Sequence, residues 1–413
     1  MPHRVDYLNA AGVFVRSVAR IPYWSLLYIS PSKRPRPTWS WFRAVVHALV
    51  LAIYSDGIPT GRLGIFIPDP PNGIDELHVN IGQPNKRKDG AIVVPAASLE
   101  KVGSEFAELA ARNGVRVGDA PVLGYWYGTR DAVGRVGYPA GVDERVHLNI
   151  HGGGHLYDTG GRGSYASHWA HRIRSQTQVF TRLFNVDYRL SLRHPSRAKA
   201  HTNPFPAAIL DCFGAYLYLI DLGFKPENII LTGDSAGANL ALTLTHLLST
   251  VNVALPGRVV VLSPAADWTL SHSGPASTAV TCAGSDYAYA FFASLECADA
   301  LRGEGFTLEE MSRNMWMCPG GRDVPVSQSK GWFTGLGTGR TRTMILAGGA
   351  ESSLDGMHCL RNRILADLGT EKADRLVYWE EPDATHDWPN FPIWEPEGAR
   401  AIRMVTDFIE QGF

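Results

Sequence analysis

Apolar and polar residues follow two spacings along most of the chain. Short apolar runs, typical of buried strands, occupy residues 145–150, 180–190, 228–232, 258–264, 342–349 and 375–380. Longer segments with apolar residues at helical spacing occupy residues 205–223, 238–249, 354–369 and 397–411. Strands that alternate with helices indicate βαβ units. We therefore predict an α/β fold with a mostly parallel central sheet flanked by helices.

This alternation begins near residue 111 and is interrupted once. Residues 1–110 are mixed in character, and 267–338 contain an aromatic, helix-like segment at 286–301 followed by loops. The pattern then resumes and continues to the end of the chain. We predict a body in two parts, 111–266 and 339–413, with 267–338 as an insertion.

Composition is consistent with a large globular protein. The chain has 413 residues, 45% of them hydrophobic and 19% charged, which fits one large domain with an insertion, or two domains. A net charge of −1 gives no support for nucleic-acid binding. The five cysteines are widely spaced without a CxxC pair, so we expect no disulfide framework and a cytoplasmic location.

The N-terminal region contains an unusual aromatic segment. No clear signal peptide opens the chain, and the first long apolar run, 44–54, is too short to span a bilayer. Residues 21–54 nevertheless combine tryptophans, other apolar residues and basic residues. Peripheral membrane contact is one interpretation. Helices packed on the body are the interpretation we favour.

A serine surrounded by small residues follows one predicted strand. Residues 233–237 read Gly-Asp-Ser-Ala-Gly, with a strand before them and a helix after them. This context matches G-x-S-x-G, a sharp strand-to-helix turn that presents a nucleophilic serine. Bulky neighbours would clash in such a turn. Ser235 is therefore the candidate nucleophile.

A glycine run follows an earlier strand. His151 is followed by three glycines, directly after the run at 145–150. Backbone N–H groups without side chains in the way stabilise the oxyanion of acyl transfer. We expect these donors at Gly152, Gly153 and Ala236. A metal pair at His151 and His155 is not expected, because their spacing aligns ligands only on a helix and the glycines disfavour one.

A nucleophilic serine needs a base, and the base needs an orienting acid, each after a downstream strand. His386 follows the strand-like run at 375–380 and is the candidate base. Two carboxylates follow the run at 342–349, namely Glu351 and Asp355. We favour Glu351, because Asp355 lies at a helix start where carboxylates are common for structural reasons.

With these residues identified, the chain resembles the hormone-sensitive-lipase-like branch of the α/β-hydrolase fold. The matching text is HGGGH, VDYRLS, NPFPAAILD, GDSAGANLAL and ATHDW, in that order from about residue 115 onward. The N-terminal tract is similar to fungal members. The resemblance implies a carboxylic-ester hydrolase without a cofactor, and a helical cap built from residues 1–110 and 267–338.

The resemblance also assigns residues. Ser235 is implied as nucleophile and His386 as base, with Gly152, Gly153 and Ala236 as oxyanion donors. The family's usual acid pattern is replaced here by ESSLD, so the resemblance leaves the choice between Glu351 and Asp355 open. The expected scaffold residues are Asp187, Tyr188, Arg189 and Asp211. The candidates for lining the substrate pocket, with a core role as the alternative, are His155, Tyr157, Tyr287, Tyr289, Phe291 and Phe292.

The function we predict is hydrolysis of a small or medium carboxylic ester through an acyl-enzyme. Two alternatives use the same fold. One is a biosynthetic acyltransferase, cyclase or tailoring hydrolase acting on a larger secondary metabolite. The other is a non-catalytic small-molecule receptor. An intact serine and histidine count against the receptor, while the sequence leaves the substrate and the oligomeric state open.

Overall fold

One eight-stranded sheet organises the protein in the computed structural model, which describes residues 4–57, 80–118, 120–191 and 202–411. The strand order is β1-β2-β4-β3-β5-β6-β7-β8, and β2 runs antiparallel to both neighbours while the other pairs are parallel. The strands are β1 (Ala91–Val94), β2 (Val122–Gly128), β3 (Val146–Ile150), β4 (Arg182–Asp187), β5 (Ile229–Asp234), β6 (Arg258–Leu262), β7 (Arg342–Gly348) and β8 (Leu376–Glu381).

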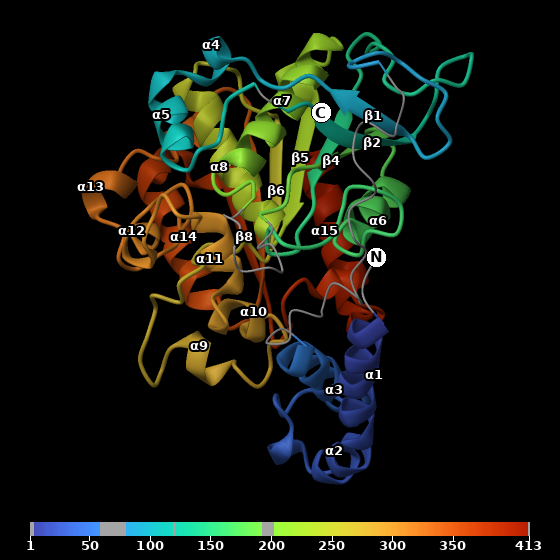
Figure 1. The fold of residues 1–413 in the computed structure, drawn as a ribbon, viewed down its shortest axis with the longest axis vertical. Helices are drawn as coiled ribbons and strands as arrows, with labels where there is room; N and C mark the ends of the chain where they lie inside the picture. The colour runs from blue at the N-terminus through green and yellow to red at the C-terminus, as the bar shows by residue number, and fades with distance from the viewer. Residues whose placement is uncertain (1–3, 58–79, 119, 192–201, 412–413) are drawn as a thin grey trace.

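Helices cover both faces of this sheet (Figure 1). They are α6 (His168–Gln176), α7 (Ala207–Asp221), α8 (Ala236–Thr250), α14 (Leu354–Leu368) and α15 (Glu397–Glu410). Successive side chains of a strand point to opposite faces. Accordingly, Leu231 of β5 lies in the core beneath α7 and α8, and its neighbour Ile230 lies in the core beneath α6 and α15. Burial on both faces explains why the strands read as continuous apolar runs.

The predicted α/β fold is confirmed, with two differences in detail. The six expected strands correspond to β3–β8, and the four expected helices of the body correspond to α7, α8, α14 and α15. The sheet, however, begins at β1, within the region that we had placed before the body. The expected helix at 286–301 is two short helices, because Leu295 adopts a left-handed conformation with φ 57°.

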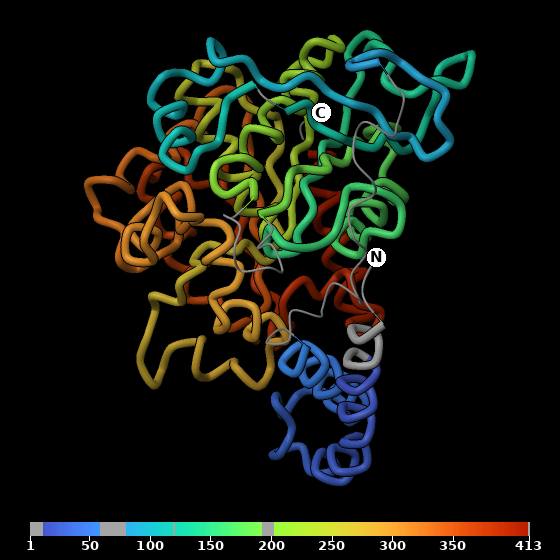
Figure 2. The backbone as a smooth tube through the Cα atoms, in the orientation of Figure 1, coloured from blue at the N-terminus to red at the C-terminus, as the bar shows by residue number. Residues whose placement is uncertain are grey.

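The N-terminal helices form a lobe that projects from the body (Figures 1 and 2). Its helices are α1 (Arg4–Ala19), α2 (Ile21–Leu27) and α3 (Trp41–Gly57). Within the described ranges, no helix is both long and apolar enough to cross a bilayer. The remaining α-helices are α4 (Leu99–Val102), α5 (Ser104–Arg112), α9 (Thr278–Thr281), α10 (Tyr289–Ala293), α11 (Glu296–Arg302), α12 (Leu308–Ser312) and α13 (Val326–Ser329). The 3₁₀ turns are η1 (Pro31–Lys33), η5 (Pro226–Asn228), η6 (Thr334–Gly337), η7 (Thr370–Arg375), η8 (Trp388–Asn390) and η9 (Pro392–Trp394).

Candidate active site

Ser235 occupies the turn between β5 and α8 with an unfavourable backbone conformation, φ 50° and ψ −114°. Such conformations persist only where the surroundings enforce them. Here the Ser235 N–H donates to the Leu262 carbonyl oxygen at 2.9 Å, which ties the turn to β6. A Cβ added at Gly237 would lie 2.0 Å from the carbonyl oxygen of Ile150. Small residues around Ser235 are therefore required for β5 and α8 to approach β3.

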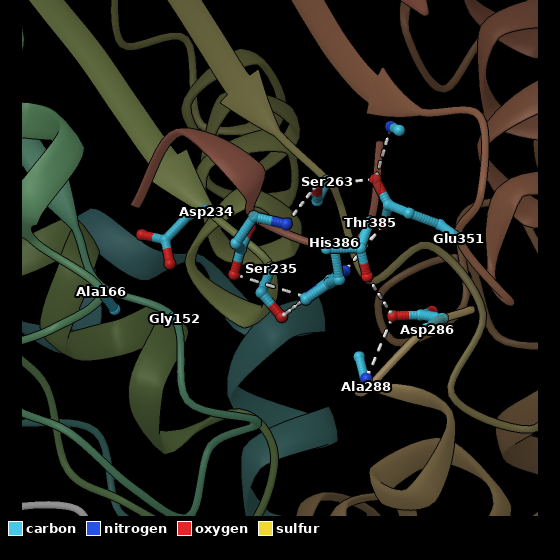
Figure 3. Close-up of polar contacts among 12 residues, drawn as sticks. Gly152, Ala166, Asp234, Ser235, Ser263, Asp286, Ala288, Glu351, Thr385 and His386 are labelled. Atoms are coloured by element: carbon cyan, nitrogen blue, oxygen red, sulfur yellow. Dashed lines mark hydrogen bonds and ion pairs between the residues drawn. The ribbon is translucent and has the colours of Figure 1, made fainter. Parts of the chain in front are cut away.

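Two loops at the carboxyl ends of β7 and β8 bring an acid and a histidine to this serine (Figure 3). His386 Nε2 lies 2.8 Å from Ser235 Oγ, and His386 Nδ1 lies 2.7 Å from Glu351 Oε2. Both side chains are buried, with Glu351 fully covered. The parallel strands end at the same edge of the sheet, so residues 151 positions apart in sequence meet there.

The second carboxyl oxygen of Glu351 is also held in place. Oε1 accepts hydrogen bonds from the Gly348 N–H at 2.6 Å and the Ser263 hydroxyl at 2.7 Å. Asp355, the alternative acid, instead accepts the N–H of Thr278 at 2.8 Å. The geometry therefore places Glu351, and not Asp355, on His386.

The glycine run after β3 approaches the same serine turn. A Cβ added at Gly152 would lie 2.4 Å from Asp234 Oδ2, and Gly153 has φ 96°. The Tyr188 hydroxyl lies 2.9 Å and 3.1 Å from the carbonyl oxygens of His151 and Gly152, to which it donates. Among the described residues, none accepts a hydrogen bond from the N–H groups of Gly152, Gly153 or Ala236. These three donors are free to meet a ligand.

A cavity of about 460 Å³ lies beside Ser235 and His386. Four of the expected pocket residues line it, Tyr157, Tyr287, Phe291 and Phe292, whereas the expected Tyr289 does not. Its other large apolar and aromatic lining side chains are Val50, Tyr54, Tyr165, Trp268 and Phe391. Val50 and Tyr54 belong to α3, so the N-terminal lobe contributes directly to the cavity.

His155, another expected pocket residue, does not line this cavity. It is 1% exposed and adopts φ 63°, and its ring packs against the rings of Trp268 and Tyr188, with centroids 5.4 Å and 6.0 Å away. Burial, together with the neighbouring His151, lowers the pKa of His155 to about 3. The core role considered from the sequence is therefore the one that the structure favours.

Sequence reasoning missed a second carboxylate beside His386. Asp387 Oδ2 lies 3.4 Å from His386 Nε2. Burial alone lowers the pKa of His386, but the negative charges of Asp387 and Glu351 outweigh burial and raise that pKa. The sequence offered one indication of this carboxylate, because Asp387 directly follows His386. No local sequence pattern pointed to Ser263 or Asp286. Asp286 accepts hydrogen bonds from Ser352 and from the Ala288 N–H.

The expected scaffold residues form hydrogen bonds that secure the loops. The Arg189 guanidinium contacts the Asp211 carboxylate at 2.8 Å, and Asp211 is 2% exposed. Asp187 accepts hydrogen bonds from the Thr159 hydroxyl at 2.7 Å and the Gly160 N–H at 2.8 Å. Asp187 thus joins the end of β4 to the loop that follows the glycine run, and Arg189 joins the segment after β4 to α7.

Residues 147–305 match a family model described as the alpha/beta hydrolase fold. An acetyl-hydrolase of Streptomyces hygroscopicus is 29% identical over 274 residues, 66% of this chain and 77% of that protein. The esterase LipU of Mycobacterium tuberculosis is 28% identical over 280 residues, 66% of this chain and 80% of that protein. Mouse hormone-sensitive lipase is 31% identical over 122 residues, only 14% of its length.

Solved structures agree on the fold. An esterase/lipase from an uncultured bacterium superposes with a TM-score of 0.51 at 24% sequence identity. The superposition covers 70% of this chain and 80% of the bacterial esterase/lipase. A Pyrobaculum calidifontis esterase gives a TM-score of 0.53 at 18% sequence identity, and the superposition covers 81% of this chain and 88% of that esterase. The chain has the α/β-hydrolase fold, and the matches support a hormone-sensitive-lipase-like α/β hydrolase.

Proposed function

We propose that this protein is a serine carboxylic-ester hydrolase that acts through an acyl-enzyme. The observation that carries the proposal is the hydrogen-bonded chain from Ser235 through His386 to Glu351. A nucleophile, a base and an orienting carboxylate in this geometry are the arrangement that acyl transfer requires. Relatives whose names are acetyl-hydrolase and esterase support the same chemistry.

Acylation begins when Ser235 Oγ attacks the ester carbonyl carbon and His386 Nε2 takes the hydroxyl proton. Glu351 accepts the Nδ1–H of His386, which keeps Nε2 free to accept that proton and stabilises the imidazolium that forms. His386 then donates the proton to the leaving alkoxide, and the alcohol departs. The acyl group stays on Ser235 as an ester.

Negative charge develops on the former carbonyl oxygen during this step. The N–H groups of Gly152, Gly153 and Ala236, which have no acceptor among the described residues, are assigned as the donors that stabilise this oxyanion. Tyr188 fixes their position through the carbonyl groups of the glycine run. Deacylation repeats the sequence with water: His386 takes a proton from water, hydroxide attacks the acyl carbon, and Ser235 leaves with the proton that His386 returns.

The cavity supports a small or medium apolar ester as substrate. Its volume of about 460 Å³ lies within the usual range of small-molecule sites, and aromatic rings dominate its lining. Helix α3 and the insertion at 267–338 supply much of that lining, with Tyr54 packed 5.2 Å from both Tyr287 and Phe291 between ring centroids. These two segments act as the cap over the nucleophile.

The test compares two serine variants. We expect Ser235→Ala to lower kcat for p-nitrophenyl butyrate by at least about 10⁴-fold and to abolish labelling by a fluorophosphonate. Ser327→Ala, at an exposed serine of the insertion, is the matched control and should leave both unchanged. Near-normal turnover by a correctly folded Ser235→Ala variant would overturn the proposal.

A further inference from the structure

The far end of the N-terminal lobe exposes a concentration of large apolar side chains. We call residues 21–42, which comprise α2, η1 and the start of α3, the lobe tip; its helix α2 lies at the end of the molecule away from the sheet (Figure 1), while Thr38 and Trp39 bond to Asp383 of the body. The exposed apolar side chains of the tip, with their exposed fractions, are Tyr23 64%, Leu26 72%, Ile29 65%, Trp41 42% and Phe42 63%. Single exposed apolar residues need no explanation, but a concentration of them indicates a contact surface.

The lobe tip is held in shape by its own hydrogen bonds. The Trp41 indole N–H donates to the Ser25 carbonyl oxygen at 2.8 Å, which joins the start of α3 to α2. The Arg34 guanidinium donates to the carbonyl oxygens of Tyr28 at 2.9 Å and Trp39 at 2.7 Å, which closes the connecting segment. The apolar side chains are therefore presented by an ordered scaffold, so a partner that binds them incurs little ordering cost.

The chain segment that contains the tip carries only positive charge in its own sequence. Residues 7–55 contain six Lys or Arg residues and no Asp or Glu, although the whole chain has a net charge of −1. Three of these cations pair with carboxylates outside this range: Arg20 with Asp56 of α3, Arg36 with Asp383 and Arg43 with Glu397. Arg16, Lys33 and Arg34 have no carboxylate partner among the described residues.

Helix α3 connects this surface to the cavity. It begins with Trp41 in the tip and reaches the cavity at Val50 and Tyr54. At 1.5 Å per residue, the distance along the helix from Trp41 to Tyr54 is about 20 Å. A surface bound by the tip thus lies about 20 Å, measured along α3, from the residues that line the cavity, on the side of the molecule that supplies the cap.

We propose that the lobe tip docks on an anionic lipid bilayer surface. Aromatic and aliphatic side chains beside Lys and Arg form the combination that inserts into the interfacial region while the cations contact lipid phosphates. Two copies of this chain meeting tip to tip would instead oppose positive charge to positive charge. The proposal goes beyond the proposed function and does not depend on it, because docking requires neither Ser235 nor His386.

Vesicle flotation with the full-length protein tests the proposal. The probe is phosphatidylcholine vesicles with about 30% phosphatidylserine, compared with phosphatidylcholine alone. The tip variant is Tyr23→Ser, Leu26→Ser and Ile29→Ser together. Its matched control replaces three exposed apolar residues outside the lobe by serine: Leu99, Val142 and Val326. Lys33→Gln tests the charge, with the exposed Lys330→Gln as its control.

We expect the wild-type protein and both controls to float with the anionic vesicles. The tip variant should bind them at least about tenfold more weakly, and Lys33→Gln about fivefold more weakly. Hydrolysis of a soluble short-chain ester should be unchanged in the tip variant, which also reports correct folding. Absence of vesicle binding by the wild-type protein, or equal binding by the tip and control variants, overturns the proposal. A wild-type dimer that only the tip variant dissociates, without vesicle binding, overturns it in favour of self-association.

Discussion

Replacing Glu351 by Gln changes one carboxyl oxygen to an amide nitrogen, and the surrounding hydrogen bonds decide which one. Oε1 accepts the Gly348 N–H at 2.6 Å and the Ser263 hydroxyl at 2.7 Å. The Ser263 oxygen in turn accepts the Asp387 N–H at 3.0 Å, so its own proton is directed toward residue 351. Two donors at one position require the amide oxygen there. The amide NH₂ must therefore take the place of Oε2, 2.7 Å from His386 Nδ1.

An NH₂ group at that position changes the tautomer of the His386 imidazole. Nδ1 then accepts a hydrogen bond, so the imidazole proton moves to Nε2 and faces Ser235 Oγ. This tautomer cannot take the serine proton. In serine proteases the equivalent carboxylate-to-amide change leaves the geometry intact but lowers kcat about 10⁴-fold. The same loss is expected here, which corresponds to about 5.4 kcal/mol of transition-state stabilisation.

The assay is kcat for p-nitrophenyl butyrate with Glu351→Gln and, as its control, Asp355→Asn. Asp355 contacts Thr278 and should lose less than about threefold, because its hydrogen bond lies outside the serine–histidine chain. Circular dichroism and the Tm of both variants establish that they fold. If Glu351→Gln keeps more than a tenth of the activity, or Asp355→Asn loses as much as Glu351→Gln, the assignment of the acid is refuted.

Three further predictions concern the surroundings of the site. Neutral His386 is the active base, so its raised pKa means that kcat/KM begins to fall with decreasing pH at a pH above 6.5. Asp387→Asn should move this acid limb of the pH profile down by about 1 pH unit. The reason is that two charges 3.4 Å apart interact by about 1.2 kcal/mol even in water. An unmoved limb would contradict this. Tyr188→Phe should lower the free energy of unfolding by about 1–3 kcal/mol and reduce kcat, measured by urea unfolding and turnover; unchanged values would show that its hydroxyl does not hold the glycine run. Val50→Phe should lower the ratio of kcat/KM for octanoate esters to kcat/KM for acetate esters by roughly 10–200-fold. An unchanged ratio would show that long acyl chains do not pass Val50.

The pattern of residues predicted the central sheet better than its edge. Strands β3–β7 are almost entirely buried on both faces, and a buried run such as 258–264 is identifiable as a strand from its apolar residues alone. Strand β1 has only four residues, and β2 reads VLGYWYG with glycines at two positions. Short or glycine-containing runs carry little periodic signal, so the antiparallel edge became visible only in the tertiary structure.

For the site, the sequence by itself determined the nucleophile turn, the glycine run and the candidate histidine, because each depends on small residues or a motif within a few positions. The choice between Glu351 and Asp355 depended on where two loops meet at the end of the sheet, a contact across 35 residues. Likewise, His155 turns away from the cavity and Val50 enters it from a helix about 185 residues before Ser235. Side-chain direction and packing between distant segments are properties of the folded chain, so only the tertiary structure decided them.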